Sequence, residues 1–177
     1  MPFPQWSYFP RNEAPPDWVE PTVAAVAAAE PAIATSLTRV ANVKSDDVLR
    51  AIAPGLVDFG WAVETGKRAG QKIERPVLYG DNGEVKVKYE IDGWHPLHQA
   101  VLEVEAGRGA ANNADYRDIV RASLLLDARY LCLVMPIDYR SGTSKWRAYA
   151  TTNAQLDAIY ASQRLRLPFD GVLLLGY

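Results

Sequence analysis

Cysteine is nearly absent from this sequence of 177 residues, in which Cys132 is the single example. One cysteine excludes a disulfide within the chain, so the fold has to be held together by its core. Cys132 lies in the apolar run of residues 130–134, which favours a buried thiol. A reducing compartment such as the cytoplasm fits this composition.

Long hydrophobic runs and an excess of charge of one sign are also missing. No apolar run reaches the length of a membrane-spanning helix, and residues 1–16 lack the charged-then-apolar order of a signal peptide. We therefore expect a cytoplasmic protein without a membrane segment. The formal net charge is -2, which gives no overall basic signature. Any contact with nucleic acid has to come from a local patch of basic residues.

The length of the chain and its hydrophobic fraction of 49% predict one globular domain. Residues 1–16 are rich in proline and contain Trp6, Tyr8 and Phe9, which predicts an extended arm rather than a helix. The aromatic side chains of this arm are expected to pack on the same domain, or else on a partner or ligand. Residues 17–177 are predicted to form the single domain.

Signals for helices and strands alternate along the domain. Ser45, Asp46 and Asp47 are typical of a helix start, and this helix is expected to be disturbed at Pro54 and to end near residue 60. Other helices are expected over residues 18–40, where Pro31 marks a break or a second start, and over about 112–128 and 151–164. Strands are expected over residues 61–64, 77–79, 85–92, 99–106, 129–137 and 171–175, with a turn over residues 93–96. Residues 77–79 and 85–87 are expected to pair as a hairpin. In helix 112–128, the apolar positions with helical spacing are Tyr116, Ile119, Val120, Leu124 and Ala128. The order predicts an α/β fold with a mixed central β-sheet flanked by helices.

Three acidic residues lie on two of the expected strands. Residues 85–92 alternate between apolar and charged side chains, and Asp92 ends the polar face. On the next strand, residues 99–106, Glu103 and Glu105 share one face. If the two strands pair as a hairpin, the three carboxylates lie close together. Mg²⁺ prefers oxygen ligands of this kind, so the cluster predicts a divalent-cation site.

This arrangement resembles the PD-(D/E)xK nuclease superfamily of restriction-endonuclease-like folds, because Asp92 is followed on the next strand by Glu103-Val104-Glu105 and then by a helix and an apolar strand. The resemblance covers approximately residues 45–135. It implies that Asp92 and Glu103 ligate Mg²⁺, or Mn²⁺ as a substitute, with help from the Val104 carbonyl. Glu105 stands where the family usually has lysine, as in a minority of restriction enzymes with an Asp, Glu and Glu set. It would orient or deprotonate the attacking water.

Other residues near this stretch have two readings each. Glu64, at the end of an expected strand, is either an additional acid of the site or an ordinary exposed glutamate. Arg108 is flanked by glycines, as in a loop that contacts phosphate, and Arg117 and Arg121 lie one turn apart on the following helix. These arginines are either weak candidates for nucleic-acid contacts or ordinary surface residues.

The resemblance implies a metal-dependent endonuclease of the restriction or defence type, which hydrolyses phosphodiester bonds of DNA. A small domain with one active site needs two copies to cut both strands, so a homodimer is expected. Glu105 leaves open a second function, namely a catalytically inactive nuclease-like domain that binds nucleic acid or protein. A third is a metal-dependent hydrolase that acts on a small phosphoester.

Overall fold

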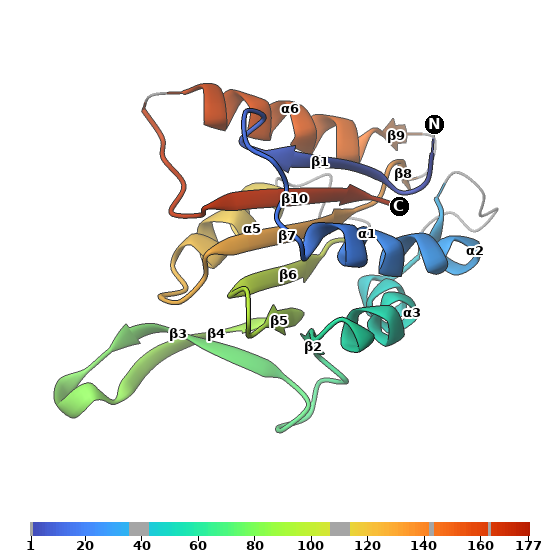
Figure 1. The fold of residues 1–177 in the computed structure, drawn as a ribbon. Helices are drawn as coiled ribbons and strands as arrows, with labels where there is room; N and C mark the ends of the chain where they lie inside the picture. Colours follow the sequence, from blue (N-terminus) through green and yellow to red (C-terminus); the bar gives the residue numbers. More distant parts are fainter. Residues whose placement is uncertain (1, 36–42, 107–113, 142–143, 163) are drawn as a thin grey trace.

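The protein is built around a six-stranded mixed β-sheet, seen in a computed structural model (Figure 1). The structure describes residues 2–35, 43–106, 114–141, 144–162 and 164–177. In spatial order, the strands are β1 (Gln5–Phe9), β10 (Gly171–Gly176), β7 (Tyr130–Met135), β6 (Ala100–Val104), β5 (Gly93–His95) and β2 (Ala62–Val63). The three central strands β10, β7 and β6 run parallel, whereas the outer strands pair antiparallel to their neighbours.

Helices cover both faces of this sheet and make a three-layer structure. One face carries α1 (Val19–Ala28), α2 (Glu30–Ile33) and α3 (Ser45–Asp58), and the other carries α5 (Ala114–Ser123) and α6 (Ala148–Ala161). The predicted α/β class with a mixed sheet flanked by helices is therefore confirmed. Among the described residues, no helix is both long and apolar enough to cross a membrane.

The central strands are buried on both faces because their side chains alternate between two hydrophobic clusters. Leu102 on β6 and Val134 on β7 pack with the helices α1 to α3, while Val101 and Leu133 pack with α5 and α6. Full burial of side chains of this size contributes roughly 1.5–3 kcal/mol each to stability. The prediction that residues 129–137 form a strand buried on both faces is confirmed by β7.

The proline-rich arm contributes the edge strand β1, which pairs with β10 over its full length. Tyr8 and Phe9 are buried in the two hydrophobic clusters of the same chain. These two aromatic side chains therefore pack on their own domain.

The helix α3 runs through Pro54 and ends at Asp58, so the expected disturbance at Pro54-Gly55 does not divide it. A Cβ atom on Gly55 would lie 2.9 Å from the Cβ atom of Ala25 in α1. The absence of a side chain at Gly55 lets α1 and α3 approach closely over the sheet. Pro31, in turn, lies in the first turn of α2, as expected for a second helix start.

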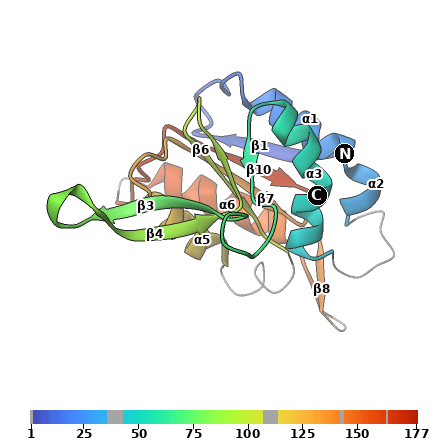
Figure 2. The same ribbon diagram turned by 90° about the horizontal axis from the view of Figure 1, so that it is seen from below.

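Residues 85–92 do not pair with residues 99–106, so the condition given for bringing the three carboxylates together is not met. The hairpin predicted between residues 77–79 and 85–87 is confirmed. The strand β4 (Val85–Ile91) pairs with β3 (Ile73–Tyr79), and this hairpin extends away from the main sheet with a short 3-10 turn, η1 (Asp81–Gly83), at its tip (Figures 1 and 2). The expected turn over residues 93–96 instead contains β5, which pairs antiparallel with β6. The chain changes partner at Asp92: β4, before it, pairs with β3, and β5, after it, pairs with β2 and β6.

A second small hairpin, formed by β8 (Tyr139–Ser141) and β9 (Ser144–Trp146), follows β7. It leads into α6, which returns the chain to β10.

Candidate functional site

The candidate site lies at the carboxyl end of β6, where acidic side chains from the sheet face the helix α5. Glu103 projects from the same face of β6 as Val101, toward the layer that contains α5 and α6. Its side chain is buried, although the glutamate carboxylate is among the groups most rarely found inside a protein. Nothing about packing requires a carboxylate at this position.

Asp92 connects three segments of the site through two hydrogen bonds. Its carboxylate Oδ2 accepts a hydrogen bond of 2.7 Å from the amide of Val104 at the end of β6. Its main-chain carbonyl accepts one of 2.8 Å from the amide of Glu64, just after β2. Asp92 therefore lies beside the Glu103-Val104-Glu105 segment, as predicted, even though β5 rather than β4 is the strand that pairs with β6.

The backbone of Glu105 is fixed on both sides. Its amide donates to the carbonyl of Val134 on β7 at 2.9 Å, and its carbonyl accepts a hydrogen bond of 3.0 Å from the phenol of Tyr177. Tyr177 is almost completely buried at the end of β10. The neighbouring strands β6, β7 and β10 thus fix the backbone of Glu105, the residue at the position where the PD-(D/E)xK superfamily usually has lysine.

Asp118 on α5 is a residue of this cluster that the sequence reasoning missed. It is 2% exposed, and its Oδ2 atom is buried without a hydrogen-bond partner. Arg117 joins it to the sheet, because the guanidinium contacts Glu105 Oε1 through Nη2 at 2.8 Å and Asp118 Oδ1 through Nε at 3.2 Å. The site therefore includes an acid from the helix layer as well as acids from the sheet.

The orientation of α5 explains why Asp118 was missed. Of the positions expected on the apolar face, Ile119 is buried, whereas Tyr116, Val120 and Leu124 are exposed. The buried residues of this segment are Asp115, Asp118, Ile119, Ala122 and Leu125. These residues recur every three or four positions and so form one stripe along the helix. The sequence pattern therefore indicates this buried face if aspartate is counted among its residues.

Burial and mutual repulsion disturb the acids of the cluster. Burial raises the pKa of Asp92 from 3.8 to about 6, against the hydrogen bond from Val104, and the charge of Glu64 adds to the increase. The pKa of Glu103 lies well above its usual range, first because of burial and then because of the charges of Asp92 and Asp118. Burial, together with a hydrogen bond and repulsion from Asp118, raises the pKa of Glu105 to about 8. These carboxyl groups act on one another across short distances, and a nearby cation would stabilise their charged forms.

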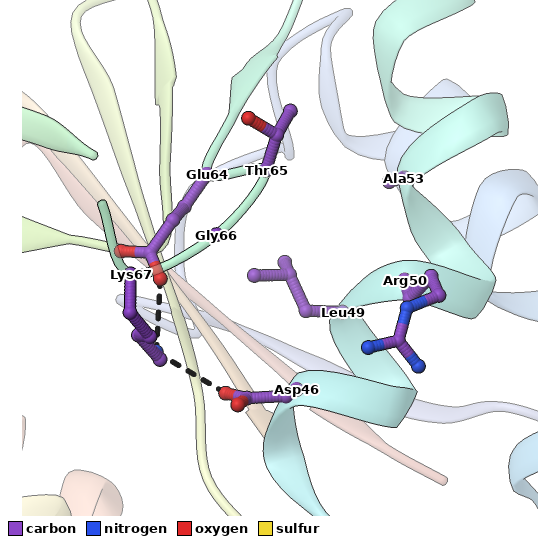
Figure 3. A pocket seen from close by; sticks show the side chains of 8 residues that line it. All are labelled: Asp46, Leu49, Arg50, Ala53, Glu64, Thr65, Gly66 and Lys67. Atoms are coloured by element: carbon purple, nitrogen blue, oxygen red, sulfur yellow. Dashed lines mark hydrogen bonds and ion pairs between the residues drawn. The ribbon is translucent and has the colours of Figure 1, made fainter. Parts of the chain in front are cut away.

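Glu64 lies at the border of the cluster, beside a pocket of about 360 Å³ between α3 and the segment that follows β2 (Figure 3). Its side chain is 6% exposed, so it is not an ordinary exposed glutamate. Lys67 contacts Glu64 at 2.9 Å and Asp46 of α3 at 3.2 Å, which ties this segment to the helix. Both acidic contacts raise the pKa of Lys67. Glu64 is thus a buried acid beside the cluster, and Lys67 is its cationic partner.

The basic candidates have different positions. Arg121 donates to the carbonyl of Glu90 at 3.0 Å and its guanidinium lies 5.4 Å from the centre of the Tyr89 ring. Its charge counteracts the increase in the pKa of Glu103, so it lies near the acids. Arg117 is 59% exposed at its side chain and contacts the acids directly. Arg108 lies outside the residues that the structure describes.

Oxygen atoms are the donors that this cluster offers to a metal ion. Among the described residues, no group of three His, Cys, Asp or Glu side chains is already arranged to hold a metal ion. A smaller set of possible metal ligands consists of the Asp92 and Glu103 carboxylates and the Val104 carbonyl. The Val104 amide donates to Asp92, and a strand residue directs its amide and its carbonyl to the same side, so this carbonyl also faces Asp92. Mg²⁺ keeps several waters and needs only one or two carboxylates, so the chemistry of this set fits it.

No protein-family model matches the chain, and no curated protein or solved structure matches it either. The fold and the site define an α/β protein whose acidic cluster lies between a central strand and the helix that covers it.

Proposed function

We propose that this protein is a metal-dependent endonuclease that hydrolyses phosphodiester bonds of DNA. The observation that carries the proposal is the gathering of Asp92, Glu103 and Glu105 at the carboxyl end of β6, where Glu103 is the one charged residue of an otherwise apolar strand and Glu105 follows directly after it. Uncompensated carboxylates in such a place cost free energy. A functional requirement for a cation accounts for their presence.

The order of elements supports the resemblance to the PD-(D/E)xK superfamily. Along the chain, α3 is followed by β2, β5, β6, α5 and β7. The acids of the motif lie at the start of β5 and at the end of β6, on neighbouring strands as the resemblance requires. The hairpin β3–β4 is an insertion between β2 and β5 that leaves this order intact.

In the proposed mechanism, Asp92 and Glu103 would hold Mg²⁺ or Mn²⁺ with the help of the Val104 carbonyl. When bound, this ion supplies the acidity of the attacking water and the positive charge that stabilises the phosphorane oxygens. Glu105 points from the same face of β6 as Glu103 and orients the water or accepts its proton. Without a cation, burial and Asp118 raise the pKa of Glu105 to about 8, so the group is mostly protonated at neutral pH; a nearby cation would lower this pKa and free the carboxylate to accept a proton.

Arg117 and Arg121 supply the positive charge near the acids that phosphate binding needs. A guanidinium group can donate two parallel hydrogen bonds to phosphate oxygens. Arg117 has most of its side chain exposed, so it can reach a phosphate beside Glu105. Arg121 lies near Glu103 and is expected to contact the DNA backbone on the β4 side.

Plasmid nicking tests this proposal. Supercoiled plasmid is incubated with the wild-type protein in Mg²⁺, in Mn²⁺ and in EDTA, and with the Asp92→Asn and Glu103→Gln variants. We expect nicking by the wild type with either metal, and nicking by the two variants no greater than that seen in EDTA. Glu20→Gln, on the exposed side of α1, is the matched control and keeps full activity. Undiminished nicking by folded Asp92→Asn and Glu103→Gln proteins refutes the assignment.

Two other outcomes select the alternative functions. Retention of DNA without cleavage under any metal condition selects a nuclease-like domain that only binds. Hydrolysis of nucleotides or other small phosphoesters without cleavage of plasmid selects the small-molecule hydrolase.

A homodimer is part of the proposal, because one copy of this site cuts one strand at a time. Gel filtration with and without DNA measures the mass. A monomer mass under both conditions counts against the dimer but not against nicking of a single strand.

A further inference from the structure

Asp118 has a carboxylate oxygen that the fold leaves without a partner. Its residue is 2% exposed, and Oδ2 receives no hydrogen bond in the structure. A buried polar atom without a partner costs about 1–3 kcal/mol, and more when it is charged. Asp118 also faces the acids of the sheet, because its charge contributes to the raised pKa values of Asp92, Glu103 and Glu105. The Asp118 carboxylate is therefore close enough to the acids of the sheet for its charge to act on them.

Asp115 on the same helix shows what a satisfied buried aspartate looks like here. It is 4% exposed, but its Oδ1 accepts a hydrogen bond of 2.9 Å from the Tyr116 amide, and its Oδ2 accepts one of 3.0 Å from the Thr152 hydroxyl. Burial of an aspartate by α5 therefore does not by itself leave an oxygen unsatisfied. The environment of Asp118 differs because Glu105 lies opposite it.

The carboxyl groups of Glu105 and Asp118 lie within hydrogen-bond reach of each other. Two carboxylates at such a distance are held together by a proton or by a cation. Neighbouring oxygens in an octahedral Mg²⁺ site, at about 2.1 Å from the ion, are about 3 Å apart, which is also hydrogen-bond distance. A divalent cation can therefore bridge these carboxylates with little movement of either.

Arg117 now links the same two carboxylates. Its Nη2 and Nε atoms contact Glu105 Oε1 and Asp118 Oδ1, at 2.8 and 3.2 Å. The rest of its side chain is 59% exposed, so the guanidinium can leave without opening the core. A cationic side chain therefore occupies the entrance to the pair and neutralises part of its charge.

We propose that Glu105 and Asp118 form a second divalent-cation position, on the helix side of the cluster and separate from the Asp92–Glu103 position, with Arg117 as its competitor. Two carboxylates are sufficient for Mg²⁺ or Mn²⁺, which complete their coordination with water or with substrate phosphate. The role of this position in cleavage rests on the proposed function, whereas its occupancy is measured without DNA.

Titration of the full-length, EDTA-stripped protein with Mn²⁺, followed by the electron paramagnetic resonance signal of free Mn²⁺, counts the bound ions. We expect two ions per chain in the wild type. Asp118→Asn keeps the shape of the side chain but is expected to weaken one of the two binding steps at least about tenfold. Glu103→Gln is expected to weaken the other step and to leave the Asp118 step in place.

The Asp115→Asn variant is the matched control, since it removes a buried charge from the same helix but leaves the Glu105–Asp118 pair intact. It is expected to bind two ions as the wild type does. Circular dichroism establishes that each variant is folded. If Asp118→Asn does not fold, Glu105→Gln removes the same position from the side of the sheet.

Arg117→Gln distinguishes between two interpretations of the Glu105–Asp118 pair, a cation-binding position and a purely structural ion pair with Arg117. Removal of a competing guanidinium shifts the affected binding step to a lower Mn²⁺ concentration, whereas loss of a purely structural ion pair does not tighten metal binding. Two results would overturn the proposal. One is a second Mn²⁺ binding step that Arg117→Gln leaves unchanged or weakens. The other is equal Mn²⁺ binding by the wild type and Asp118→Asn. Failure of the wild type to cleave DNA would refute the nuclease function. It would not change the conclusion from the Mn²⁺ titration, which is carried out without DNA.

Discussion

Asp92→Asn is expected to stabilise the metal-free protein, although Asp92 lies at the centre of the site. Burial raises the pKa of this carboxyl group from 3.8 to about 6, so the folded protein holds the proton more tightly than the unfolded chain does. Raising the pH from about 4 to about 6 therefore favours unfolding, and above this range the cost stays constant. The asparagine variant has no charge to bury, and its side-chain oxygen can still accept the hydrogen bond from Val104.

The size of the effect follows from the same pKa. A tenfold change in proton affinity is equivalent to about 1.4 kcal/mol, so the increase to about 6 corresponds to about 3 kcal/mol. The side chain retains some exposure to solvent, which screens the charge and reduces the expected gain to about 2 kcal/mol. We expect this gain at pH 8 and only a small part of it at pH 4, where the carboxyl group is protonated in the folded protein and about half ionised in the unfolded chain.

Urea denaturation in EDTA at pH 4 and pH 8, followed by circular dichroism, measures the difference. Asp81→Asn, at the exposed tip of the hairpin, is the control and should change the free energy of unfolding by less than about 0.5 kcal/mol at either pH. A gain in Asp92→Asn that is the same at both pH values would refute the electrostatic reasoning. So would a loss of stability at pH 8.

Two other predictions concern the surroundings of the site. Tyr177→Phe removes the hydrogen bond to the Glu105 carbonyl and should lower the free energy of unfolding, measured in urea, by about 1 kcal/mol. The same change at the half-exposed Tyr79 should be neutral, and equal effects of the two changes would contradict the role given to this bond. Cys132 is fully buried, which also raises the pKa of its thiol, so a thiol reagent should label it only in denaturant; rapid labelling of the native protein would show that β7 is accessible.

The parts of the fold that the sequence predicts are those with a local signal. The Ser45-Asp46-Asp47 start of α3 and the apolar run of β7 each carry their own pattern, and both elements were found where expected. The shared face of Glu103 and Glu105 follows from the alternation of side chains in any strand, whichever neighbour that strand has. Glu103 was therefore correctly placed on β6 before the partner of this strand was known, whereas Glu105 lies directly after its end.

The missed parts depend on which segments meet in three dimensions. Gly93 to Pro96 has the composition of a turn, yet β6 offers its edge to residues 93–95, and tertiary pairing overrides local preference. A Cβ atom on Gly93 would lie 3.0 Å from the Leu102 side chain, so glycine here serves close packing of strands rather than a turn. Asp118 was missed for a related reason: only the packing of α5 shows which of its faces turns inward.

The hairpin β3–β4 gives the protein a place where foreign sequence can be added. Its tip, Asp81–Gly83, is exposed and makes its hydrogen bonds within the turn, and the hairpin pairs with no strand of the main sheet. An epitope tag or a fluorophore-binding peptide inserted between Asn82 and Gly83 would therefore project from the molecule and leave Asp92 in its place. Such an insertion would label the protein without touching the acids of the candidate site.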